Sequence, residues 1–146
     1  MELIHATAID VAGKGVLLCG PSGAGKSDLA LRLIDRGATF IADDQVQLEV
    51  RRRGLFASAP DRLRGYLEVR GLGIQSVPTA GGSFVALVVD LVAADQVPRL
   101  PQPAYRDLVG KKIPLLCLNA FEVSAAIKIE LAARDTAKIG GVGPDG

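Results

Sequence analysis

Short runs of apolar residues, separated by glycine-containing turns, alternate with one helical pattern in the first third of the chain. Apolar residues at helical spacing follow the second run, and Gly37 marks the predicted end of that helix. These patterns predict two strands joined by a hairpin, then a helix and a third strand, at residues 2–10, 16–19, 28–35 and 39–42. Their strand–helix–strand order predicts a parallel, right-handed crossover.

The remainder of the chain continues to mix strand and helix patterns. Alternating or β-branched apolar segments predict further strands, and a 3.6-residue period predicts a closing helix, at residues 45–51, 83–91, 112–118 and 120–137. We expect the loop at 78–83 to be mobile and the tail from about 138 to 146 to be disordered. The pattern predicts a single α/β domain spanning residues 1–146.

Composition narrows the class of protein further. The chain is 49% hydrophobic and 23% charged, with a net charge of +1, and it shows no broad basic face for nucleic acid. The run Arg51–Arg53 fits a solvated turn better than a nucleic-acid patch. No apolar stretch approaches the roughly 20 residues of a membrane-spanning helix. Cys19 and Cys117 lie in apolar strands and predict buried thiols, so a cytoplasmic protein is expected.

A phosphate-binding motif lies between the second predicted strand and the helix. The segment matches every fixed position of the P-loop pattern G-x-x-x-x-G-K-[ST] and consists of Gly20, Pro21, Ser22, Gly23, Ala24, Gly25, Lys26 and Ser27. Because a helix N-terminus aims backbone N–H groups and partial positive charge at one point, it binds a polyphosphate there. Lys26 is expected on the β- and γ-phosphates of ATP and Ser27 on Mg²⁺.

Asp43 and Asp44 end the strand that follows the P-loop helix. In an open α/β sheet, ligands bind beyond the carboxyl ends of the parallel strands, so this pair is expected to face the phosphates. Adjacent strand residues point to opposite faces, so the two acids cannot have equal roles unless the strand ends between them. One can hold Mg²⁺, directly or through water, while the other accepts a proton from an attacking hydroxyl. A surface turn with two solvated acids is the alternative.

Two further residues have open interpretations. Glu68 lies between Leu67 and Val69, so it is either a structural ion pair with Arg64 or Arg70, or a metal ligand. His5 is the sole histidine of the chain, and by itself it fits a solvated strand residue as well as a catalytic one.

These features occur together in one family. The P-loop, the segment Ile41–Asp44 and above all Glu68-Val69-Arg70-Gly71-Leu72-Gly73-Ile74 resemble the catalytic domain of HPr kinase/phosphorylase, from about residue 3 to 118. The resemblance implies a P-loop core of mixed sheet similar to phosphoenolpyruvate carboxykinase. It also implies a homo-oligomer, which is a hexamer in the family.

The resemblance implies an activity and roles for single residues. In the family, ATP phosphorylates a serine of HPr, a phosphocarrier protein, and inorganic phosphate removes that phosphoryl group at the same site. Lys26 would contact the transferring group, Ser27 and Glu68 would hold Mg²⁺, and Asp44 would be the proton acceptor. Asp43 would support Asp44, and His5 would orient or neutralise the phosphates. The family's arginine corresponds to Arg99, with Arg106 as a rival.

The sequence also departs from the family pattern. The segment after Ile74 is about ten residues shorter than in the family, where this loop approaches HPr, and His5 is followed by alanine rather than glycine. Residues 118–122 replace the family's P-G-R-N element. These departures resemble the short, single-domain members. Two other functions stay open, an ATP-sensing module without phosphotransfer and a small-molecule kinase.

Overall fold

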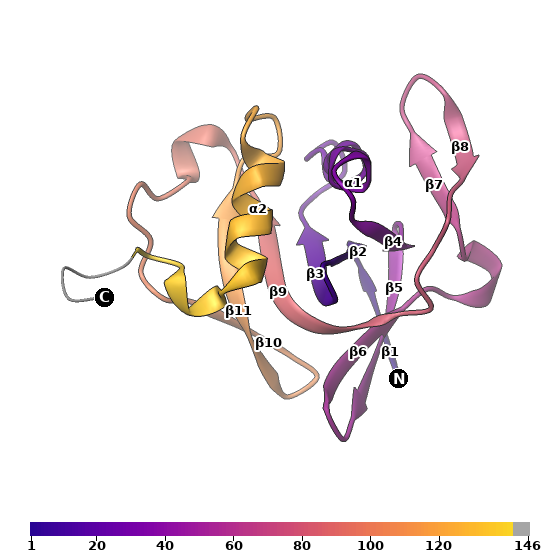
Figure 1. The fold of residues 1–146 in the computed structure, drawn as a ribbon, viewed down its shortest axis with the longest axis horizontal. Coiled ribbons are helices and arrows are strands. Elements are labelled where there is room, and N and C mark those ends of the chain that lie inside the picture. Colours follow the sequence, from indigo (N-terminus) through magenta and orange to yellow (C-terminus); the bar gives the residue numbers. More distant parts are fainter. Residues whose placement is uncertain (142–146) are drawn as a thin grey trace.

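One curled sheet with two helices on one face carries the fold (Figure 1). The structure, a computed structural model, describes residues 1–141, so most of the predicted disordered tail lies outside the described residues. The strands of the main sheet are β1 (Glu2–His5), β2 (Thr7–Val11), β3 (Lys14–Cys19), β4 (Thr39–Ala42), β5 (Gln45–Arg51), β6 (Gly54–Ser58), β9 (Ser83–Leu91), β10 (Tyr105–Leu108) and β11 (Lys111–Leu118). A separate ribbon is formed by β7 (Tyr66–Val69) and β8 (Gly73–Ser76).

Two α-helices and three single 3-10 turns complete the secondary structure of the described residues. The helices are α1 (Lys26–Asp35) and α2 (Ala125–Arg134), and the 3-10 turns are η1 (Asp61–Leu63), η2 (Ala94–Gln96) and η3 (Thr136–Lys138). Helix α1 ends as predicted, because Gly37 has a φ of 110° and closes the helix in the left-handed region. No helix within residues 1–141 is long and apolar enough to cross a membrane.

The sheet is mixed, which confirms the predicted α/β class. Its order is β1-β5-β6-β9-β3-β2-β4, with β11 also paired to β9 and β10 paired to β11. Strand β9 is parallel to β3 and β11, and the other pairings are antiparallel. Since β3 and β4 are both antiparallel to β2, they run parallel to each other with β2 between them. Their carboxyl ends therefore meet at one edge of the sheet.

Alternation along the central strands divides the core into two layers. Leu18 of β3 packs under α1 and α2, whereas its neighbour Leu17 faces the inside of the curled sheet, and both are fully buried. A fully buried leucine contributes about 1.5–3 kcal/mol relative to an exposed one. The two apolar layers hold β3 rigidly, and β3 leads directly into the P-loop.

The strand predicted at 2–10 is wrong as a single element. The chain changes partners at Ala6, because β1 pairs with β5 whereas β2 pairs with β3 and β4. Ala6 is completely buried, and its N–H donates to the carbonyl of Asp44 at 3.3 Å. An alternating pattern reports which face a residue takes but not which strand it pairs with, so this break was invisible in the sequence.

The closing helix is shorter than the predicted 120–137. Asn119 ends β11 in a turn, since its Oδ1 accepts the N–H of Phe121 at 3.0 Å and its Nδ2 donates to the carbonyl of Val92 at 3.0 Å. The guanidinium of Arg32 donates to the carbonyls of Ala120 and Glu122. These contacts fix the backbone in a non-helical form until Ser124, so α2 begins only at Ala125.

Candidate active site

The P-loop joins β3 to α1 and forms a cradle at the helix N-terminus. Gly25, directly before the helix, has a φ of 92°. A Cβ at this position would lie 2.8 Å from the Cβ of Ala120, so backbone conformation and space both require glycine. The first backbone N–H groups of α1 have no partner within the helix and are available to an anion.

Lys26 is the charged group of the cradle. Its side chain is buried, with 8% of the residue exposed, and Nζ donates to the carbonyls of Gly20 at 2.7 Å and Pro21 at 3.0 Å. An ammonium held by two neutral carbonyls keeps its positive charge uncompensated. The loop is therefore electropositive where a phosphate would bind.

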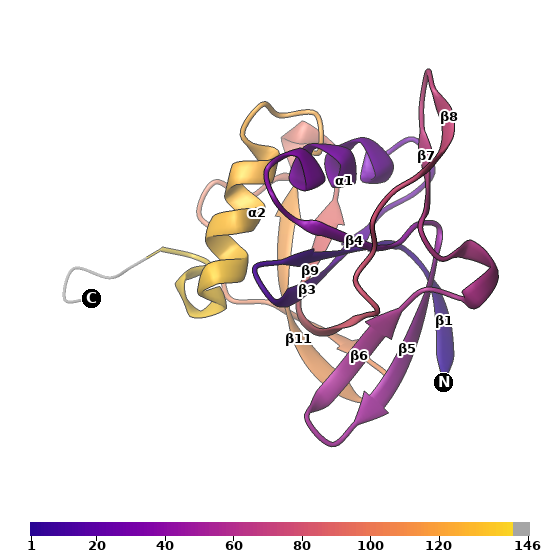
Figure 2. The ribbon, with the colours of Figure 1, turned by 45° about the vertical axis from the view of Figure 1, so that its right-hand side comes forward.

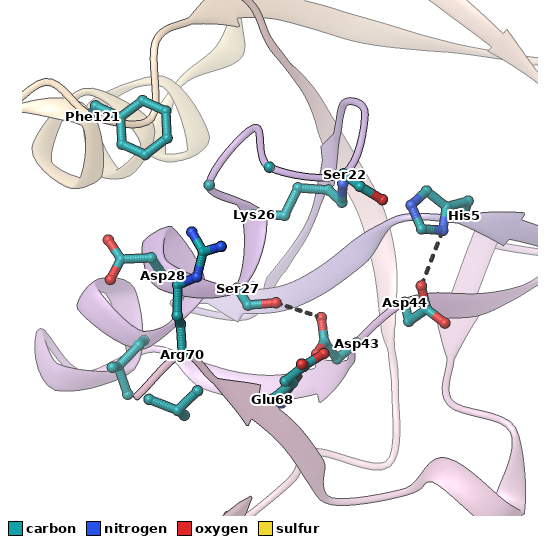
Figure 3. A pocket seen from close by; sticks show the side chains of 14 residues that line it. His5, Ser22, Lys26, Ser27, Asp28, Asp43, Asp44, Glu68, Arg70 and Phe121 are labelled. Atoms are coloured by element: carbon teal, nitrogen blue, oxygen red, sulfur yellow. Dashed lines mark hydrogen bonds and ion pairs between the residues drawn. The ribbon is translucent and has the colours of Figure 1, made fainter. Parts of the chain in front are cut away.

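Asp43 connects three elements below the cradle (Figure 3). Its Oδ1 accepts hydrogen bonds from Oγ of Ser27 and Oγ1 of Thr7, both at 3.0 Å. Its Oδ2 accepts the backbone N–H of Glu68 at 3.2 Å. The carboxylate is thus held between β2, α1 and β7, and its orientation is fixed by three donors.

Asp44 has a different conformation and a different partner. Strand β4 ends at Ala42, and Asp44 has a φ of 69°, which is uncommon for a residue with a side chain. Its Oδ1 lies 3.1 Å from Nδ1 of His5, and the two side chains are 68% and 52% exposed. This turn therefore presents Asp44 to solvent while Asp43 points toward Ser27 (Figure 3).

Glu68 projects from β7 into the same space, close to Asp43 (Figure 3). Of the alternatives that the sequence left open, the ion pair with Arg64 does not form, because Arg64 binds Asp61 at 2.7 Å. Arg70 also lines the cavity, and no ion pair joins it to Glu68 within residues 1–141. The exposed carboxylate of Glu68 thus remains available to a ligand.

The oxygen atoms in this region fit a magnesium ion. Mg²⁺ in phosphate-binding sites takes one or two carboxylates together with phosphate and water oxygens. Ser27, Asp43 and Glu68 supply a hydroxyl and two carboxylates beside the cradle. No group of three or more His, Cys, Asp or Glu side chains that could hold a metal alone occurs in the described part of the chain. A metal here would depend on phosphate and water oxygens for the rest of its shell.

A cavity of about 610 Å³ brings most of the predicted site residues together. It is lined by His5, Lys26, Ser27, Asp43, Asp44 and Glu68, with several P-loop residues. Neither Arg99 nor its rival Arg106 lines it. Arg106 binds Asp90 at 3.2 Å, and Arg99 is exposed in the segment between η2 and β10. The role of Arg99 stays a prediction.

Thr7 and Phe121 are among the lining or supporting residues that were not predicted. Thr7 is completely buried and holds Asp43, and its signal in the sequence is a hydroxyl within an otherwise apolar strand. Phe121 lines the cavity opposite His5 (Figure 3). Its position depends on the turn at Asn119, which the helical pattern concealed.

Both cysteines are free thiols, and each is half-buried rather than fully buried as predicted. Burial raises the pKa of Cys19 above its ordinary value of 9.0, an effect that Arg106 partly opposes. Burial likewise raises the pKa of Cys117, with a further contribution from Asp90. Both thiols thus favour the protonated form at neutral pH, which argues against a nucleophilic role.

Comparison with known proteins identifies one family. Residues 1–136 match the family described as the HPr Serine kinase C-terminal domain. The HPr kinase/phosphorylase of Bordetella pertussis is 39% identical over 146 residues, covering 91% of this chain and 47% of the relative. That of Caldanaerobacter subterraneus is 42% identical over 113 residues, covering 73% and 36%.

A solved structure has the same fold. The HPr(Ser) kinase/phosphatase from Coxiella burnetii aligns with a TM-score of 0.81 at 28% identity, covering 94% of this chain and 91% of that one. The chain spans about half the length of the curated relatives from Bordetella that it matches.

Proposed function

The chain belongs to the HPr Serine kinase C-terminal domain family, and from this we propose that it transfers a phosphoryl group from ATP to a serine of an HPr-type phosphocarrier protein. One observation supports the proposal most strongly. A P-loop lysine, two carboxylates with different partners and a histidine line a single cavity. Phosphoryl transfer requires such a combination of phosphate binding, charge neutralisation and a proton acceptor.

Each residue then has a separate task. The N–H groups at the start of α1 and the ammonium of Lys26 bind the β- and γ-phosphates. Ser27, Asp43 and Glu68 would hold Mg²⁺, which neutralises charge on the phosphates when bound. The three donors to Asp43 keep its carboxylate aimed at that position.

Asp44 is the proposed proton acceptor. As the serine oxygen forms its bond to the γ-phosphorus, the bond from that phosphorus to the ADP oxygen breaks, and the serine proton passes to the Asp44 carboxylate. His5 lies 3.1 Å from this carboxylate and orients it. Because Asp44 is exposed, a serine carried on another protein can reach it.

A protein acceptor also needs a surface beside the cavity. The β7–β8 ribbon extends from the body of the molecule next to the site (Figure 2), and its Leu72 and Ile74 are 72% and 71% exposed. Large apolar side chains that stay exposed at the rim of a cavity are typical of interaction surfaces. We propose that the acceptor protein contacts this ribbon.

The direct test is transfer of label from γ-labelled ATP to HPr in the presence of Mg²⁺. We expect label on a serine of HPr, and none on HPr whose acceptor serine is replaced by alanine. Binding of ATP without transfer would contradict the proposal and favour an ATP-sensing module. Incubating phosphorylated HPr with inorganic phosphate tests the reverse reaction in the same assay, with pyrophosphate as the expected product.

A further inference from the structure

Phe121 is a large aromatic side chain left exposed at the mouth of the P-loop. It is 67% exposed, although its neighbours Ala120 and Ala125 are buried in the core. The ring lies against the loop, since a Cβ at Gly25 would be 3.3 Å from two of its carbon atoms. Phe121 therefore presents an aromatic face to solvent directly beside the phosphate cradle.

Phe121 separates two cavities. Besides the cavity of about 610 Å³ that holds the catalytic carboxylates, a second one of about 440 Å³ lies on the other side of the P-loop. Its walls are the P-loop segment 21–24, the end of β9 and η2. The two cavities share Ser22, Gly23 and Phe121, so a ligand seated in the cradle has access to both.

The direction of a bound nucleotide follows from the positions of the carboxylates. Figure 3 shows Phe121 at the opposite end of the site from His5 and Asp44, with Lys26 between them. The γ-phosphate must be near Asp44 if that carboxylate accepts the proton of the acceptor serine. The remainder of the nucleotide then extends from Lys26 toward Phe121.

The polar groups of the second cavity differ in availability. The Asn119 amide already has partners at both ends, because its Nδ2 donates to the carbonyl of Val92 and its Oδ1 accepts the N–H of Phe121. Asn119 therefore fixes the backbone of Phe121. Gln96 is exposed on η2 and lines the cavity. Its amide carries donors and an acceptor, which is the combination that the edge of an adenine base requires.

We propose that the adenine base of ATP stacks on Phe121 and that base and ribose occupy the second cavity, with Gln96 facing the base edge. The inference rests on the proposed function for the identity of the ligand and, through the role of Asp44, for the direction in which it lies. Stacking on an aromatic side chain accounts for an exposed ring at this position, whereas packing against Gly25 alone would not require an open face.

Binding of two ligands by calorimetry separates these roles. Tripolyphosphate with Mg²⁺ occupies the cradle but has no base, whereas Mg-ATP has both parts. We expect Phe121→Leu to weaken ATP binding by about ten-fold, as loss of one base stack does, and to leave tripolyphosphate binding unchanged. Phe121→Tyr should restore ATP binding because it keeps the aromatic face.

Val123→Ala is the matched control. Val123 is 97% exposed, lies two residues away and lines neither cavity, so its removal should change neither affinity. An equal loss of affinity for ATP and for tripolyphosphate in Phe121→Leu would overturn the inference. It would mean that the ring supports the P-loop. Unchanged ATP binding would overturn it as well. Failure of the unsubstituted chain to bind ATP would instead overturn the proposed function.

Discussion

At the scale of single residues, the proposed function makes phosphate binding depend most on the side chain of Lys26. We expect Lys26→Ala to abolish transfer to HPr and leave the fold intact, because Nζ contacts only two carbonyls of its own loop. The transfer assay and thermal unfolding measure the two effects separately. Lys14→Ala, at an exposed position at the start of β3, is the control and should stay active. An active Lys26→Ala variant would show that the P-loop assignment is wrong.

We expect the thiol of Cys19 to make the free energy of unfolding depend on pH. Burial raises its pKa in the folded chain, so the unfolded thiol ionises first, at about its ordinary 9.0. The contribution of Cys19 to stability is therefore complete below pH 9 and is lost as pH rises toward the folded pKa. Urea unfolding of the unsubstituted chain and Cys19→Ala should show a difference in unfolding free energy that shrinks above pH 9. A difference independent of pH would contradict this account.

At the scale of elements, the β7–β8 ribbon depends on one buried side chain. Leu67 is completely buried in the cluster under α1, and the N–H of the next residue, Glu68, binds Asp43. We expect Leu67→Ala to lower the free energy of unfolding by about 2–5 kcal/mol, measured in urea. Ile74→Ala, on the exposed face of β8, should change it by less than about 0.5 kcal/mol. If Leu67→Ala and Ile74→Ala changed the free energy of unfolding by similar amounts, the ribbon would not be held by the packing of Leu67.

Elements were predictable where local pattern and turn residues agree. Strand β9 is a mostly apolar, valine-rich segment, and Gly37 closes α1 with a positive φ, so both were predicted correctly. The break at Ala6 and the late start of α2 depend on partners distant in sequence. Strand β10 was missed because four residues with alternating burial carry too weak a pattern.

At the scale of the whole molecule, the sheet assembles one site from distant segments. The P-loop motif and the position of Asp43 and Asp44 at a strand end were sufficient to predict the centre of the cavity. Thr7 and Phe121 escaped prediction because their positions depend on the strand exchange at Ala6 and the turn at Asn119. Arg99, predicted from resemblance, does not line the cavity.

The central claim is that this cavity transfers a phosphoryl group with Asp44 as the proton acceptor. The most direct test is the single-turnover rate of phosphoserine formation on HPr at saturating Mg-ATP, for the unsubstituted chain and Asp44→Asn. Loss of a general base predicts a rate lower by about a hundred- to ten-thousand-fold, with ATP affinity unchanged. Asp95→Asn, at an exposed position outside both cavities, should keep the full rate. A full rate in Asp44→Asn would contradict the account.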